Sequence, residues 1–423
     1  MSEKRNQVEL STISSKFTEE TLRNIFATVC NETDVKVSDW DFGTASAKGD
    51  SYLSVVNRVT VNGFAKGKPV KVDLVIKSLP KTLGRRKTYR STVFFRNEIA
   101  FYTKVVPKFE QFLKSKNQAH LLCVPRHLGS LADGENDYLV LENVCTLGFG
   151  PVTRHNFISM EDCIGILETF ATFHAISFAY KDQHKEEFTK CVSHLEETYF
   201  TPKYWDWYEK FHQRLVNIAT DALTIEYPNH EALKRFTSYK FGSLFDMCCE
   251  ICGRTDAPTS VVSQGDSWAP NIFVRTIEGN KREALMLDFQ LAHCVSPVLD
   301  LSFFIYSCTD KALRERFNDM LKIYHNKLCS IITSLGSDAK KLYPWETFMK
   351  EAKEQFFYGI VFALEALPIA MLDESEAFDL DELIKGDEAV NINDIWTLPK
   401  LETQQKRLRV ADIIVHAVEN GFL

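Results

Sequence analysis

Two aspartates and an asparagine stand at spacings that suit chemistry on a phosphate group. Asp266 precedes Asn271 in the segment Gln-Gly-Asp-Ser-Trp-Ala-Pro-Asn, and the apolar strand Leu-Met-Leu ends in Asp288, before Phe and Gln. Phosphoryl transfer needs a carboxylate that orients the attacking hydroxyl, and hard oxygen ligands that hold magnesium on the phosphates. In kinases, an Asp–Asn loop supplies the base and one metal ligand, and an Asp before Phe supplies the other. The spacing therefore favours phosphoryl transfer.

A lysine and a glutamate nearer the N-terminus fit the same chemistry. Lys77 closes the apolar strand Leu-Val-Ile, where a kinase places the amine that grips the α- and β-phosphates of ATP. Glu98 lies in a helical stretch that follows this strand. Either residue alone would be interpreted as an ordinary surface charge. The two together, one closing an apolar strand and the other in the helical stretch that follows, indicate a phosphate-binding site.

The elements that must position these residues change in kind along the chain. Alternating apolar residues predict strands within 35–77 and around 124–131 and 138–141, with a turn at Asn62-Gly63 and one helix over 92–113. Later segments predict amphipathic helices around a strand-rich island at 260–291; the helices span 161–180, 205–222, 231–253, 313–335, 345–370 and 403–422. We expect an α+β architecture with a small β-rich lobe, residues 1–144, and a large helical lobe, residues 145–423.

The motif around Asp266 resembles that of the ecdysteroid-kinase-like (CHK kinase-like) family, within the aminoglycoside phosphotransferase and choline kinase group. Gly-Asp-x-Trp-x-x-Asn and Asp-Phe-Gln carry the resemblance, which covers nearly the whole chain. It implies a two-lobed protein-kinase-like fold that binds ATP and Mg²⁺ between the lobes. The implied roles are catalytic base for Asp266, magnesium ligands for Asn271 and Asp288, and an ion pair between Lys77 and Glu98.

The resemblance also implies roles for backbone positions. Gly49 and Ser51 occupy the phosphate-covering turn, and Glu142 and Val144 lie in the connector that hydrogen-bonds adenine. Gln264 stands where the family usually has His, in a position that supports the geometry of the loop.

Two further residues are expected to have structural roles. We expect His174 to be a packed helix residue, and Asp300 to anchor the catalytic loop through hydrogen bonds.

The expected function is ATP-dependent phosphorylation of a hydroxyl group on a small molecule. A protein acceptor is disfavoured because the chain lacks His-Arg-Asp and Ala-Pro-Glu segments and has a short interval between Asp288 and Asp300. The resemblance points to an ecdysteroid, another steroid alcohol or a hydroxylated xenobiotic. A cationic acceptor of the choline or aminoglycoside type is one alternative, since the acidic run from Asp373 to Glu382 could line a pocket, although a solvated loop is favoured there. A nucleotide-binding pseudokinase is the other alternative, which Gln264 alone favours.

Composition excludes several other classes. The formal net charge of −7 disfavours a nucleic-acid partner, and the basic stretch 81–90 is expected to be a solvated loop. We expect no membrane partner and a cytoplasmic location, because no apolar run suits a signal or a span. The 11 cysteines, with Cys249 and Cys252 at C-x-x-C spacing, are expected to be free thiols rather than a zinc or redox site.

Overall fold

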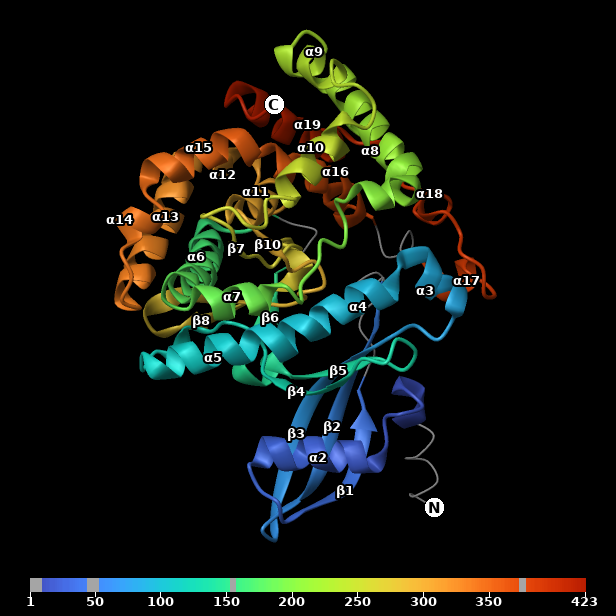
Figure 1. The fold of residues 1–423 in the computed structure, drawn as a ribbon. Helices are drawn as coiled ribbons and strands as arrows, with labels where there is room; N and C mark the ends of the chain where they lie inside the picture. Colours follow the sequence, from blue (N-terminus) through green and yellow to red (C-terminus); the bar gives the residue numbers. More distant parts are fainter. Residues whose placement is uncertain (1–9, 44–52, 153–156, 373–377) are drawn as a thin grey trace.

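The computed structural model describes residues 10–43, 53–152, 157–372 and 378–423 of the 423-residue chain. Its N-terminal part is a five-stranded antiparallel sheet in the order β1-β2-β3-β5-β4. The strands are β1 (Val35–Phe42), β2 (Val55–Ala65), β3 (Lys68–Ser78), β4 (His127–Leu131) and β5 (Tyr138–Glu142). Helix α2 (Glu19–Cys30) crosses one face of this sheet and buries Leu22, Ile25 and Phe26 against it (Figure 1).

The predicted turn at Asn62-Gly63 is wrong, because both residues lie inside strand β2. The chain reverses instead at Lys66 and Gly67, which both have a positive φ, as hairpin turns of this length require. Gly63 has a packing role: a Cβ atom there would lie 2.4 Å from the Lys36 carbonyl oxygen and 2.9 Å from the Phe26 ring. Glycine thus lets α2 approach the sheet.

The helix predicted over 92–113 has a wider turn in its middle. Helix α4 (Ser91–Ala100) passes through a π-type turn (Phe101–Val105) into helix α5 (Val106–Ser115). Pro107 lies in the first turn of α5 and has no N–H to continue the regular ladder, which accounts for the change of pitch.

The basic stretch 81–90 is not a solvated loop. It forms helix α3 (Leu83–Tyr89) followed by Arg90 in the left-handed conformation. The Arg90 guanidinium lies over the rings of Phe94, Tyr204 and Trp207, at 4.8, 3.5 and 4.1 Å from their centroids. Aromatic rings attract a cation, so this arginine joins α3 to the helical lobe.

Helices form most of the chain beyond residue 157 (Figure 1). They are α6 (Met160–Gln183), α7 (Lys185–Val192), α8 (Trp205–Glu226), α9 (Glu231–Thr237), α10 (Ser243–Cys252), α11 (Val298–Cys308), α12 (Lys311–Arg314), α13 (Phe317–Ser334), α14 (Ala339–Leu342), α15 (Trp345–Gln355), α16 (Phe357–Ala370), α17 (Leu380–Leu383), α18 (Ile392–Ile395) and α19 (Gln404–Glu419). The helix predicted over 231–253 is two helices, because the chain turns at Gly242, whose φ is +82°. The fold is the predicted α+β one, with a small β-rich part followed by a large helical part, while the domain boundary at residue 144 stays a prediction.

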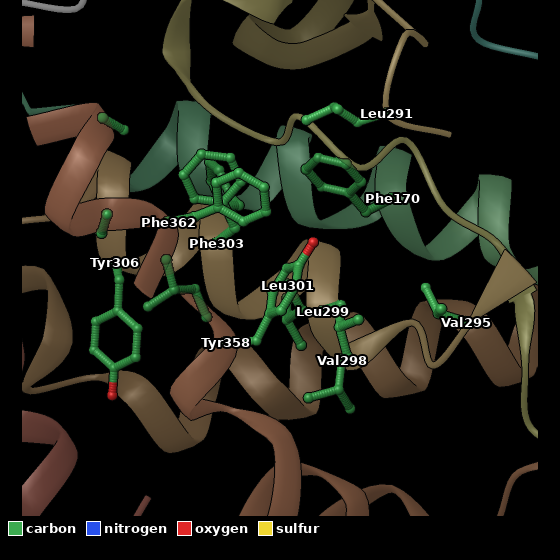
Figure 2. Close-up of a cluster of buried hydrophobic side chains, with 14 of the residues drawn as sticks. Phe170, Leu291, Val295, Val298, Leu299, Leu301, Phe303, Tyr306, Tyr358 and Phe362 are labelled. Atoms are coloured by element: carbon green, nitrogen blue, oxygen red, sulfur yellow. The ribbon is translucent and has the colours of Figure 1, made fainter. Parts of the chain in front are cut away.

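Helix α6 runs through the centre of the helical part and packs against α13 and β9. By length and composition α6 could cross a membrane, but 89% of its most apolar window is buried inside the fold. Figure 2 shows its Phe170 in a cluster with side chains of α11 and α16, among them Leu301, Phe303 and Phe362. The cluster thus accounts for the apolar character of α6.

Helices α11 and α16 are in close backbone contact. A Cβ atom at Gly359 would lie 2.2 Å from the Ser302 carbonyl, so only glycine permits this crossing. Beside it, the rings of Phe303 and Phe362 stack with centroids 4.7 Å apart.

Two small sheets at the junction of the lobes carry the loops of interest. One has the order β6-β8-β9 and the other pairs β7 with β10; the strands are β6 (Gly150–Pro151), β7 (Val261–Val262), β8 (Ile272–Ile277), β9 (Lys281–Met286) and β10 (Cys294–Val295). Because Ile272 pairs with Met286 in antiparallel register, the residue before β8 and those after β9 lie at the same end of the hairpin. This register brings Asn271 close to Asp288.

Candidate active site

The loop between β7 and β8 holds Asp266 at the edge of a pocket. Its carboxylate accepts hydrogen bonds from Asn271 Nδ2 at 2.8 Å and Gln290 Nε2 at 3.4 Å. Burial, and next the nearby charge of Asp288, raise the pKa of Asp266 to about 7. A carboxyl group with this pKa can accept a proton near neutral pH.

Gln264 links the two halves of the site. Its Nε2 donates to the carbonyl oxygens of Leu287 and Asp288, at 2.8 and 2.9 Å, and its Oε1 accepts from the backbone N–H of Asp266 at 2.9 Å. The amide side chain therefore fixes the spacing between the Asp266 loop and the Asp288 turn, which is the loop-supporting role predicted for this position.

Asp300 anchors the same loop, as predicted. It accepts hydrogen bonds from the backbone N–H groups of Gln264 and Gly265, at 2.7 and 2.8 Å, and from Ser267 Oγ at 2.7 Å. Burial by itself would raise the pKa of Asp300, but the hydrogen bond and charge of His174 and these donors outweigh it and lower the pKa.

Gly265 lets the loop approach its neighbour. Its φ is +84°, and a Cβ atom there would lie 2.2 Å from the Leu291 carbonyl oxygen. His174, the packed helix residue predicted in α6, is buried between Asp300 and Tyr324, at 3.0 and 2.8 Å.

Asp288 follows β9 in a left-handed conformation, with φ of 67°. The backbone N–H of Leu287 donates to the Asn271 carbonyl at 2.8 Å, which holds the two predicted metal ligands side by side. Asp288 Oδ1 is buried and has no hydrogen-bond partner among the described residues. A buried carboxylate oxygen without a partner is costly. The donor set of Asn271 and Asp288 therefore fits a hard divalent cation, which prefers oxygen ligands.

Lys77 and Glu98 form the predicted ion pair. Lys77, on the central strand β3, donates to Glu98 Oε1 and Oε2 of α4 at 2.9 and 2.7 Å, and its Nζ lies 3.0 Å from Asp288 Oδ2. Burial alone would lower the pKa of Lys77, but the charges of Asp288 and Glu98 outweigh it and raise the pKa, so the amine stays protonated. One ammonium group thus bridges the sheet, α4 and the Asp288 turn.

An aromatic contact joins the same elements. The ring of Phe289, next to Asp288, stacks on Phe101 with centroids 3.8 Å apart and planes at 4°. Nearby, Asn97 Nδ2 donates to the carbonyl oxygens of Gln290 and Ala292, at 3.0 and 2.8 Å. Helix α4 therefore holds both Lys77 and the segment after Asp288.

Two of the residues predicted to contact the nucleotide, Glu142 and Val144, lie at the end of β5 and just after it. Glu142 ends β5 and pairs with Leu74 of β3. Val144 is buried, and its cluster includes Leu285 and Leu287, close to Asp288. Gly49 and Ser51 lie outside the described residues, and so does the acidic run from Asp373 to Glu376.

A pocket opens beside Asp266, Asn271 and Asp288, and most of its wall was missed by the sequence analysis. Its other lining residues come from segments far apart in the chain: Leu53, Tyr89, Phe94, Tyr199, Trp207, Trp268, Pro270, Gln290, Leu291, Phe303, Phe362, Glu365, Ala366, Ile369 and Trp396. Most of these residues lie in separate segments that no local spacing connects, so the pocket was not predictable from the sequence. Glu365 could have been noticed, because it is the one charged residue within the apolar helix α16.

A second group of possible metal ligands lies away from this pocket. Glu197, Cys252 and His293 place one ligand atom each within 4.8 Å of one another. Glu197 Oε1 already accepts from the backbone N–H groups of Tyr199 and Phe200, at 2.6 and 2.7 Å, and its Oε2 lies 3.0 Å from His293 Nε2. Because its carboxylate oxygens are engaged, we interpret the group as an internal brace.

One comparison with known proteins matches most of the chain. The model of the ecdysteroid kinase-like family matches residues 48–337, well over half of the chain. The match includes Lys77, Glu98, Asp266, Asn271 and Asp288. No curated protein gives a significant match.

The solved structures that this chain resembles include three that are distant in sequence. An ethanolamine kinase from Plasmodium vivax is 12% identical, with 87% of this chain and 94% of that chain covered and a TM-score of 0.36. The choline kinase LicA from Streptococcus pneumoniae is 12% identical, over 83% of this chain and 98% of that one, with a TM-score of 0.33. The GDP complex of aminoglycoside 2′-phosphotransferase-IIIa is 12% identical, over 88% and 100%, with a TM-score of 0.38. Similarities at this distance say nothing about the acceptor.

Proposed function

This chain belongs to the ecdysteroid kinase-like family, and we propose that it transfers the γ-phosphoryl group of ATP to a hydroxyl group of a small, mostly apolar molecule. A steroid alcohol such as an ecdysteroid, or a hydroxylated xenobiotic, is the proposed acceptor. The coarser assignment, a small-molecule kinase, follows from the family. The observation that carries the finer proposal is the aromatic pocket that opens beside the carboxylate of Asp266.

In the proposed mechanism, Asp266 accepts the proton of the acceptor hydroxyl as its oxygen attacks the γ-phosphorus. A new oxygen–phosphorus bond forms, the bond between the γ-phosphorus and the β–γ bridging oxygen breaks, and ADP leaves with that oxygen. Asn271 Nδ2, at 2.8 Å from the carboxylate, holds Asp266 in one orientation. Gln290 Nε2 also donates to this carboxylate, at 3.4 Å, and gives a second restraint on its orientation.

Lys77 is proposed to bind the α- and β-phosphates of ATP, with Glu98 holding the amine in place. Asn271 and Asp288 would bind Mg²⁺, which when present neutralises charge on the β- and γ-phosphates. The buried, unpartnered Oδ1 of Asp288 supports this assignment. The backbone at Glu142 and Val144 is proposed to contact adenine, and the turn with Gly49 and Ser51 to cover the phosphates.

A neutral acceptor suits the pocket wall better than a cationic one. Phe94 and Trp207 line the pocket, and both rings already lie against the Arg90 guanidinium. A ring that binds one cation attracts a second cation less, because the two positive charges repel. We therefore favour a neutral alcohol over a choline-like acceptor.

The test is ADP release by the purified protein with Mg²⁺ and ATP, against ecdysteroids, hydroxylated xenobiotics, choline and aminoglycosides. Turnover with a steroid or xenobiotic alcohol, and none with Asp266→Asn, is the expected result. Turnover confined to choline or aminoglycosides would overturn the proposed acceptor. Binding of nucleotide without turnover on any acceptor would favour a pseudokinase.

A further inference from the structure

Helix α16 presents one polar side chain to the pocket within an otherwise apolar stripe. Phe362, Glu365, Ala366 and Ile369 line the pocket, at the spacing of one helix face. Glu365 is half-buried, and a glutamate is rarely found on an apolar helix face unless it is paired. Its place in this stripe therefore needs an explanation beyond packing.

The contacts of Glu365 leave half of its carboxyl group available. Tyr199 and Tyr208 donate to Oε2 at 2.7 and 3.2 Å, and no residue that the structure describes donates to Oε1. No lysine, arginine or histidine in the described ranges forms an ion pair with it either. The two tyrosines thus orient the group without neutralising it, and one oxygen remains for a ligand in the pocket.

Asp266 lies within electrostatic range of Glu365. Both residues line the same pocket. An acceptor that places one hydroxyl at Asp266 therefore meets a second carboxyl group elsewhere in the same pocket.

We propose that Glu365 determines acceptor specificity by accepting a hydrogen bond from a second hydroxyl group of the acceptor. The acceptor is then an apolar molecule with at least two hydroxyl groups, one for phosphorylation and one for recognition. This inference rests on the proposed function, since it takes the pocket to be the acceptor site. A hydroxyl is proposed rather than an ammonium group because the acceptor proposed above is a neutral alcohol.

The test uses linear probes that differ in one end group. The α,ω-alkanediols from propanediol to decanediol are compared with their mono-methyl ethers, which cannot donate at that end, and with the matching amino alcohols. Binding is followed at pH 8 by the fluorescence of Trp207, Trp268 and Trp396, which all line the pocket. At the best length, the diol is expected to bind about tenfold more tightly than its ether, the effect of one hydrogen bond to a charged group.

Two variants assign that preference to Glu365. Glu365→Leu is expected to bring the diol and its ether within about twofold of each other. Glu365→Gln keeps the tyrosine contacts but presents a donating amide, so the advantage of the diol over the ether is expected to shrink. Glu351→Gln is the matched control, because Glu351 accepts from Tyr343 in a similar way but does not line the pocket.

Three results would overturn the inference: equal binding of diol and ether at every length, an unchanged preference in Glu365→Gln, or tighter binding of the amino alcohols. If Glu365→Leu does not fold, Glu365→Gln alone tests whether Glu365 causes the preference for the diol. ADP release is measured in parallel with the same probes. Absence of ADP release would count against the proposed function. The fluorescence titration tests the role of Glu365 independently, because it measures binding and needs no turnover.

Discussion

The amine nitrogen of Lys77 lies 3.0 Å from Asp288 Oδ2, so a residue of the N-terminal sheet contacts the turn that follows β9. The same nitrogen lies 2.7 Å from Glu98 Oε2. One ammonium group thus contacts the buried carboxylate of Glu98 and the half-buried carboxylate of Asp288, which come from separate elements. Because the Asp288 carboxyl is the proposed metal ligand, this contact sets the distance between the phosphate-binding and metal-binding parts of the site.

Replacing Lys77 with methionine is expected to lower kcat/KM by about a hundredfold or more, because the phosphates lose their fixed positive charge. The variant should also unfold more easily, since the buried carboxylate of Glu98 and the half-buried one of Asp288 lose their partner. Steady-state kinetics and urea unfolding measure the two effects. Lys71→Met is the control, because Lys71 lies exposed on the same strand; equal losses in both variants would contradict the assigned role.

Asp266→Asn is expected to lower kcat by about a thousandfold, because the amide cannot accept the proton of the acceptor. Nucleotide affinity should change little, since Lys77 and Asp288 remain. Single-turnover kinetics and nucleotide titration separate the two quantities. Asp246→Asn, on the surface of α10, is the control. Near-normal turnover in Asp266→Asn would show that another group is the base.

Gly265→Ala is expected to destabilise the protein and abolish activity, because the new Cβ atom would meet the Leu291 carbonyl in the catalytic loop. Gly134→Ala is the control, because Gly134 has a similar φ of +88° but nothing within 4 Å of its Cβ position. It measures the cost of the left-handed backbone alone, without a steric clash. We expect the alanine at 265 to cost at least about 2 kcal/mol more than the alanine at 134. Similar unfolding free energies for the two variants would refute the close approach.

Gln264→Ala is expected to reduce kcat by about tenfold to a hundredfold, because the loop loses the links that fix Asp266 relative to Asp288. Gln264→His should retain activity equal to or above that of the wild type, since an imidazole can both donate and accept. Kinetics of both variants at saturating ATP make the comparison. An inactive histidine variant would mean that the amide has a specific function.

Glu365→Gln is expected to stabilise the protein at pH 8 but not at pH 5. Burial raises the pKa of Glu365 to about 7, above the value of 4.5 for an unperturbed glutamate. Between these values the folded state holds a proton that the unfolded state has released, so the stability of the wild type falls as pH rises. The variant lacks this loss, worth up to about 3 kcal/mol. Thermal unfolding across pH 5–8 tests it, and parallel curves for the two proteins would contradict it.

The sequence was most informative where one short segment carries the chemistry. Asp266, Asn271 and Asp288 were identified because a loop and the end of a strand fix their types and spacing. The ion pair of Lys77 and Glu98 was predicted from the family resemblance instead, because no single segment holds both residues. The close approach of Asn271 and Asp288 was not predictable, because it depends on the antiparallel register of β8 and β9.

The acceptor pocket depends on tertiary contacts that a sequence pattern does not encode. Tyr89, Trp207, Phe362 and Trp396 come from segments far apart in the chain, and each reads as ordinary helix packing. The sequence predicts a solvated loop around Arg90 because two of its aromatic partners, Tyr204 and Trp207, lie beyond residue 200. Asn62-Gly63 has a high turn propensity, but Gly63 lies inside a strand, where the Phe26 ring packs closely against it.

The protein is proposed to phosphorylate an alcohol that binds in the pocket beside Asp266, with ATP as the phosphate donor. The most direct measurement is mass spectrometry of a polyhydroxylated steroid after incubation with ATP, Mg²⁺ and either the wild type or Asp266→Asn. We predict that the steroid gains a phosphate with the wild type and remains unmodified with the variant. A steroid that gains phosphate equally with both proteins, or with neither while the wild type phosphorylates choline, would contradict the account.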